Sequence, residues 1–382
     1  MTEDKATVYH RLRRRAELAG TAAAAVTLIA LIVSGGAVRL REIASNTGQV
    51  TPGFEEAVTV VVTALLLFGL LALLELPFAF YQGYTLEHRY ALSNQALRQW
   101  AADQAKGAVL GAMITGVGAS IVYAFISWNR DWWWLPAAGV FAMLMIGLAQ
   151  IAPVVLMPLF FRFKPLDRPA LVDRLMALAR RAQTPVVGVY EWALSAHTKK
   201  ANAALAGMGR TRRILLADTL LADYSEDEIE VVMAHELSHH VHHDIWRGLA
   251  LQAVVLFAGF LGAHLGLRAF ADRAGLRGLD DPAGLPILLA IAGAVTLVAA
   301  PLVNALSRAH ERRADRYALD ATRRPDAFIS AMKRLAQQNL AEDDPSELVQ
   351  WLFYSHPPIR QRLAAARAWA AEAPQKAGNV VA

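Results

Sequence analysis

The chain has 382 residues, of which 55% are hydrophobic and only 19% are charged. This composition is too apolar for an ordinary soluble enzyme and predicts a polytopic membrane protein. The net charge of +5 requires no nucleic-acid partner, because basic cytoplasmic loops and contacts with anionic lipid head groups account for it. The chain has no cysteine, which excludes disulfides, thiolate metal ligands and a cysteine nucleophile.

Six apolar segments are long enough to cross a bilayer. They cover residues 17–38, 57–81, 106–128, 132–158, 246–268 and 284–306. The basic run that precedes the first segment, residues 11–15, should remain in the cytoplasm. Alternation then places residues 159–245 and 307–382 on the cytoplasmic side. We expect an N-terminal membrane domain of four spans over 1–158, and a second domain over 159–382 that includes the last two spans.

Further elements are expected outside and inside the spans. Glu75 lies within the second span, where a carboxylate is costly in lipid and should face a polar interior. Between the fourth and fifth spans, composition and patterning predict a helix over Leu166–Arg181, strands over Val186–Trp192 and Arg213–Ala217, and a turn over Ala203–Arg210 between these strands. Further helices are expected over 310–340 and 358–372.

The next predicted helix carries the pattern His-Glu-x-x-His at residues 235–239. Residues i and i+4 share one helix face, so His235 and His239 can bind one Zn²⁺. Glu236 can then act as general base toward a metal-bound water. Ser225 and Glu228 predict a capping box at the start of this helix. The neighbouring histidines, His240, His242 and His243, are expected to be solvated or interfacial.

A second polar stripe follows the sixth span. Its members are spaced as one face of a helix and are Asn304, Arg308, Glu311 and Asp315. A catalytic zinc site has three protein ligands and one open position, so Glu311 is the candidate third ligand. Asp315 can accept the free N–H of a ligand histidine. The alternative interpretation is an amphipathic helix with surface ion pairs.

The position of the predicted metal relative to the membrane is informative. His239 precedes the fifth span by about seven residues, or roughly 10 Å of helix, and Glu311 follows the sixth span at a similar distance. The metal should therefore lie close to the membrane boundary. A site in that place suits substrates that are themselves attached to the membrane.

These residues resemble a known family, the membrane-integrated gluzincin metalloproteases, and specifically the type I CAAX prenyl proteases. The motif at His235–His239 and the downstream Glu311–Asp315 carry the metal part of the resemblance. Four further segments resemble family motifs and appear in the family's order: residues 76–90, 158–166, 202–220 and 354–362. The resemblance covers about 60–370. Because the composition is rich in Ala and Arg, we expect a bacterial homologue in the cytoplasmic membrane.

The resemblance implies a mainly α-helical membrane barrel that encloses a chamber. A zinc protease domain with a small β-sheet would close its cytoplasmic end, with one Zn²⁺ per chain. In the family, the enzyme cuts the bond after a prenylated cysteine and releases the last three residues. The resemblance further implies that Asn202 and His356 line the substrate cleft, with His356 acting in catalysis, and that Arg362 supports substrate binding or the fold around His356.

We therefore expect a membrane-embedded zinc metalloendopeptidase that acts on a peptide or protein substrate, prenylated or otherwise associated with the membrane. One alternative is a quality-control protease for damaged membrane proteins, of the heat-shock type. An alternative of another class is a membrane transport or lipid-binding protein with a structural zinc. A structural site is closed by four protein ligands and has no use for Glu236, so the presence of this glutamate favours an enzyme.

Overall fold

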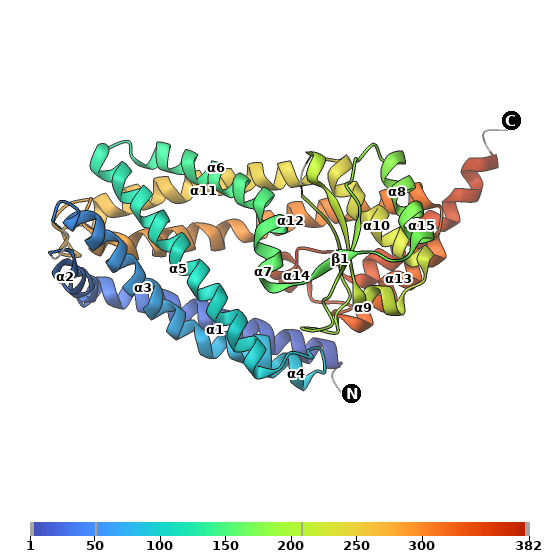
Figure 1. Cartoon of the computed structure of the whole chain (residues 1–382), viewed down its shortest axis with the longest axis horizontal. Helices are drawn as coiled ribbons and strands as arrows, with labels where there is room; N and C mark the ends of the chain where they lie inside the picture. The colour runs from blue at the N-terminus through green and yellow to red at the C-terminus, as the bar shows by residue number, and fades with distance from the viewer. Residues whose placement is uncertain (1–3, 50–51, 208, 379–382) are drawn as a thin grey trace.

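The computed structural model describes residues 4–49, 52–207 and 209–378, without the side chains of residues 210 and 373–378. Within these residues, six helices are long and apolar enough to cross a membrane, which confirms the predicted polytopic architecture. They cover Lys5–Val33 (α1), Glu55–Arg89 (α3 and α4, joined by a π-helical segment), Leu97–Trp128 (α5), Trp134–Phe160 (α6 and α7, joined in the same way), Asp244–Phe270 (α11) and Pro282–Thr322 (a 3₁₀ turn followed by α12, Leu285–Thr322). They form one end of an elongated molecule, and the sheet with its shorter helices forms the other (Figure 1).

The first span differs from its predicted bounds of 17–38. Helix α1 begins at Lys5 and ends at Val33, because Gly35 adopts a left-handed φ of 71° that an α-helix cannot continue through. A short helix, α2 (Gly36–Gly48), follows directly. A buried ion pair holds α2 to the segment before α12, with Arg41 Nη1 2.7 Å from Asp281 Oδ2.

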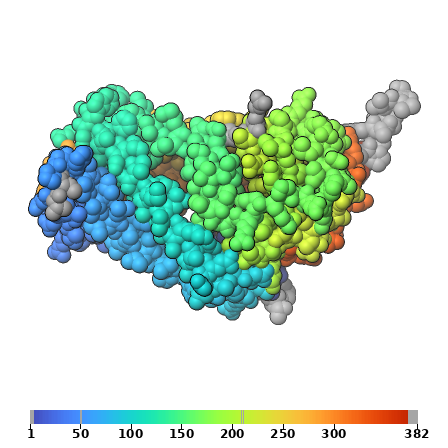
Figure 2. All heavy atoms as spheres, in the orientation of Figure 1, coloured from blue at the N-terminus to red at the C-terminus, as the bar shows by residue number. Residues whose placement is uncertain are grey.

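A cavity of about 650 Å³ lies among the membrane helices α1, α3 and α12. Glu75 of α3 lines it together with Arg13 and Gln82, which agrees with the polar surroundings expected for an acid inside a span. Gly20 allows α1 to approach this carboxylate, since a Cβ at Gly20 would lie 2.9 Å from Glu75 Oε2. The surface is also hollowed between α5 and α6, as Figure 2 shows. The helices therefore surround internal space and do not form a solid bundle.

A small mixed sheet of four strands lies beside the membrane helices, with the order β1-β2-β4-β3. The strands are β1 (Phe163–Pro165), β2 (Val189–Trp192), β3 (Ala203–Ala206) and β4 (Arg213–Ala217). Strand β2 runs parallel to β4, and the other two pairings are antiparallel. The predicted strands at β2 and β4 are confirmed, whereas β1 was not expected.

The predicted turn over Ala203–Arg210 is wrong in its first half. Residues 203–206 form the edge strand β3, with Ala203 opposite Leu216 of β4. Their side chains alternate between buried and half-buried, which is the period of a strand. The chain turns only at Gly207, where φ is 92° and a Cβ would lie 2.7 Å from the carbonyl oxygen of Thr211.

The remaining helices complete the second domain around one hydrophobic core. They are α8 (Pro169–Arg181), α9 (Asp218–Asp223), α10 (Glu226–Val241), α13 (Pro325–Gln338), α14 (Glu347–Phe353) and α15 (Ile359–Gly378). Leu171, Leu175 and Leu178 of α8 are almost fully buried in this core. Burial of each such leucine contributes about 2 kcal/mol to stability. Helix α10 is therefore held on a rigid base, with its C-terminal end at the membrane helices.

Candidate metal centre

Helix α10 begins with the predicted capping box. The Ser225 hydroxyl accepts a hydrogen bond from the Glu228 amide at 3.3 Å, and the Ser225 amide donates to Glu228 Oε2 at 2.8 Å. These bonds satisfy two N–H groups at the helix start, and the residues from Ile229 to Ala234 are buried. The cap and the core together fix the rotation of α10, which presents His235 and His239 to helix α12.

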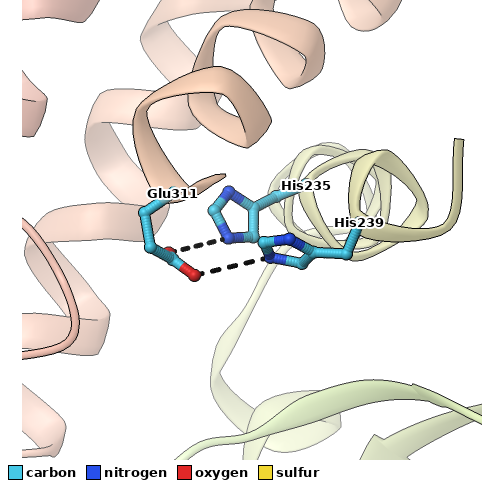
Figure 3. A group of neighbouring side chains, drawn as sticks. All are labelled: His235, His239 and Glu311. Atoms are coloured by element: carbon cyan, nitrogen blue, oxygen red, sulfur yellow. Dashed lines mark ion pairs between the residues drawn. The ribbon is translucent and has the colours of Figure 1, made fainter. Parts of the chain in front are cut away.

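Glu311 of α12 reaches both histidines (Figure 3). Its Oε2 lies 3.2 Å from His235 Nε2, and its Oε1 lies 3.4 Å from His239 Nε2. One ligand atom from each of the three residues lies within 4.8 Å of the others. Two ligands of a tetrahedral Zn²⁺ are about 3.3 Å apart when each bond is about 2.0–2.1 Å. The buried Glu311 Oε2 has no hydrogen-bond partner among the described residues, so the donor set fits a metal ion.

His235 is held by a second carboxylate. Its Nδ1 lies 2.9 Å from Asp315 Oδ1, one helical turn beyond Glu311. Arg362 of α15 donates from Nε to Asp315 Oδ2 at 2.8 Å. Burial lowers the pKa of His235, but the neighbouring carboxylates of Asp315 and Glu311 outweigh this effect and raise that pKa to about 9. When Asp315 accepts the Nδ1 proton, Nε2 is left free to bind a metal.

His239 has an equivalent partner that the sequence analysis missed. Its Nδ1 lies 3.1 Å from Oδ2 of Asp244, a buried residue at the start of α11. Arg313 of α12 forms an ion pair with the other oxygen of Asp244. His243, with a left-handed φ of 57°, directly precedes α11 and turns the chain so that Asp244 faces His239. The only sequence signal for this contact is an acid shortly after the second histidine.

Glu236 lies beside the three candidate ligands and is half-buried. Burial raises the pKa of this carboxyl to about 7, against the lowering effect of His235. A carboxylate with a pKa close to neutrality is suited to accept a proton from water and release it again.

Four residues of α12 form the predicted stripe, and its first two hold a neighbouring segment. Arg308 donates to the carbonyl oxygens of Gln350 and Tyr354, at 3.0 and 2.6 Å. Asn304 donates to the carbonyl oxygen of Leu352 at 2.7 Å. These bonds hold the C-terminal end of α14 against α12. Because Arg308, Glu311 and Asp315 are all buried, the alternative of a surface ion-pair stripe is wrong for them.

The segment after α14 carries His356 to the centre. Its Nε2 lies 3.5 Å from Glu311 Oε1, and its Nδ1 lies 2.9 Å from the Ser355 hydroxyl. The imidazole is 61% exposed, so it faces open space beside the candidate ligands. Arg362 contacts Asp315, and its Nη2 lies 3.5 Å from His235 Nδ1. Asn202 directly precedes the edge strand β3 and is exposed.

Two family models match almost the whole chain. Residues 165–370 match peptidase family M48. Residues 2–162 match a family described as the CAAX prenyl protease N-terminal region with five membrane helices. In this chain the described part of that region holds four candidate spans and the short helix α2.

Relatives agree with these matches. The chain is 32% identical over 285 residues to the uncharacterized metalloprotease YhfN of Bacillus subtilis, covering 74% of this chain and 67% of the relative. It is 30% identical over 300 residues to the CAAX prenyl protease 1 homolog of Arabidopsis thaliana, covering 76% of this chain and 69% of that relative. The crystal structure of S. mikatae Ste24p shares the fold, with a TM-score of 0.84 and 22% identity over 95% of this chain and 88% of that one. The chain therefore belongs to peptidase family M48 and is a membrane-embedded metalloprotease.

Proposed function

We propose that this protein is a zinc endopeptidase in which His235, His239 and Glu311 hold one Zn²⁺. The observation that carries the proposal is the spacing of these three donors, with Glu311 Oε2 buried and without a hydrogen-bond partner. Asp315 and Asp244 support it, because each orients the outer nitrogen of one histidine and leaves the inner nitrogen for the metal.

The bound zinc would polarise the scissile carbonyl and make water a better nucleophile at neutral pH. Glu236 takes the proton of the attacking water and passes it to the leaving amine. His356 donates a hydrogen bond to the carbonyl oxygen as negative charge develops on it. Asn202 binds the backbone of the substrate from the start of β3, and Arg362 keeps Asp315 in place beside His235.

The substrate is proposed to be a peptide anchored in the membrane by a prenyl or similar apolar chain, as the names of the CAAX prenyl protease relatives suggest. The cavity among α1, α3 and α12 offers about 650 Å³ near the membrane helices that carry the site. Burial of a lipid chain contributes about 0.8 kcal/mol per CH₂. We place the protein in a bacterial cytoplasmic membrane with the metal centre on the cytoplasmic side, and retain the division into domains 1–158 and 159–382.

The test compares purified wild type with Glu236→Gln in liposomes. The wild type should contain one zinc per chain and cleave a farnesylated peptide with a higher kcat/KM than the same peptide without the farnesyl group. The Glu236→Gln protein should keep its zinc and lose hydrolysis. Full activity of Glu236→Gln would contradict the mechanism. Equal cleavage of the two peptides would contradict the lipid anchor and favour quality control of unfolded membrane proteins.

A further inference from the structure

A second cavity, of about 330 Å³, adjoins the metal centre on the side of His239. Its walls include Arg212, His240, His243 and Trp246 as well as His239 itself, and none of its lining residues is acidic. We call this space the basic pocket. The lining of the pocket includes His239 but not His235, whose Nδ1 is paired with Asp315.

Arg212 gives the basic pocket a fixed positive charge. Its Nε is buried without a hydrogen-bond partner, and its guanidinium forms no ion pair in the part of the chain that the structure describes. The nearby carboxylate of Asp244 is already paired with His239 and Arg313. A buried cationic donor without a partner is costly. An anion that enters the pocket would therefore find in Arg212 a hydrogen-bond donor that is already in place.

The edge strand β3 leads to the basic pocket. The carbonyl of Asn202 accepts a hydrogen bond from the Ala217 amide. In an antiparallel pair every second residue bonds to the neighbouring strand, so Ala204 and Ala206 also face β4. Ala203 and Leu205 therefore direct their N–H and C=O groups to the free edge. His240 donates from Nε2 to the Leu205 carbonyl at 3.2 Å and occupies that position. A peptide that pairs with this edge at Ala203 must leave it at His240, which lines the pocket.

We propose that the basic pocket binds a carboxylate of the peptide substrate, with Arg212 as the specificity-determining residue. A guanidinium matches a carboxylate with two parallel hydrogen bonds, which gives a directional preference as well as charge attraction. The carboxylate is either an acidic side chain near the scissile bond or the free C-terminus. This inference rests on the proposed peptidase function and specifies which peptides that site selects.

The experiment uses the full-length enzyme in neutral liposomes and matched lipidated peptides. One pair of peptides differs only in a C-terminal acid or amide. The others exchange Asp for Asn at single positions on either side of the scissile bond. The wild type should prefer one carboxylate by about 10-fold in kcat/KM, equivalent to about 1.4 kcal/mol. In Arg212→Gln, kcat/KM for the preferred acidic peptide should fall to the value for its neutral partner. Arg212→Lys should keep part of the preference.

Arg213→Gln is the matched control, because it removes the same charge from the adjacent residue. The Arg213 guanidinium stacks over Tyr190 at 5.3 Å and faces a different cavity, so this variant should keep the wild-type preference. The proposal is overturned if Arg212→Gln retains the preference, or if it lowers cleavage of both peptides equally. It is also overturned if the wild type shows no preference for a carboxylate in neutral liposomes. Loss of all cleavage in the wild type would instead contradict the peptidase function itself.

Discussion

Replacement of Asp244 by Asn tests whether the structure identifies the groups that orient the metal ligands. Asp244 Oδ2 lies 3.1 Å from His239 Nδ1, and the side chain is only 4% exposed. The substitution keeps the volume of the side chain, so it creates no cavity. It removes the negative charge that orients His239, and loss of such a partner weakens metal binding by about 10–100-fold.

The upper half of that range is expected here because Asp244 has a second role. Its other oxygen pairs with Arg313 of α12, the helix that carries Glu311. Asp244→Asn therefore disturbs two of the three ligand positions. Zinc affinity should be measured by competition with a chelator of known affinity, and thermal unfolding of the zinc-loaded protein should be recorded in parallel.

Arg313→Gln provides the comparison, because it removes the second contact and leaves the bond between His239 and Asp244 in place. It should weaken zinc binding less than Asp244→Asn does. The reasoning would be refuted if Asp244→Asn bound zinc as tightly as the wild type, or if both variants weakened binding equally.

Three further predictions concern turnover. His356→Ala should lower kcat by about 10²–10³ with little change in KM, because its hydrogen bond is used in the transition state; a change confined to KM would show a binding role. Arg308→Met should lower kcat at unchanged zinc content, because the bonds from Arg308 to the end of α14 position His356. Arg316→Ala, on the exposed face of α12, is the control and should have no effect on kcat. Equal kcat values for Arg308→Met and the wild type would contradict this role. Activity should be lost as the pH falls through about 7, because Glu236 accepts a proton only when ionised and burial raises its pKa to about 7. A pH–rate profile without this acidic limb would count against Glu236 as the base.

The spacing of residues along single helices was enough to predict which candidate metal ligands share a helix face. His235 and His239 follow from the helical period, and the period of the later stripe placed Glu311 and Asp315 on one face. That these two helices meet could be proposed only from the resemblance and from the chemistry of the ligands. The spans were visible because length and hydropathy depend little on tertiary contacts.

The sequence was less informative where tertiary contacts decide the structure. Strand β3 consists of Ala-Ala-Leu-Ala, which has little intrinsic strand propensity, and it forms because it pairs with the buried β4. The contact between Asp244 and His239 depends on the left-handed backbone of His243, which a residue other than glycine rarely adopts. The unpaired charge of Arg212 is likewise a property of its surroundings in the fold.

The continuity of α12 has a consequence for biogenesis. This helix, Leu285–Thr322, is the last candidate span among the described residues, and its C-terminal part carries Glu311. The two histidines of α10 are synthesised well before it, so the growing chain holds an incomplete donor set until its final hydrophobic segment has emerged. Glu311 reaches its place only when that segment is inserted and packed against α11. Assembly of the complete donor set is thereby coupled to the membrane integration of α12.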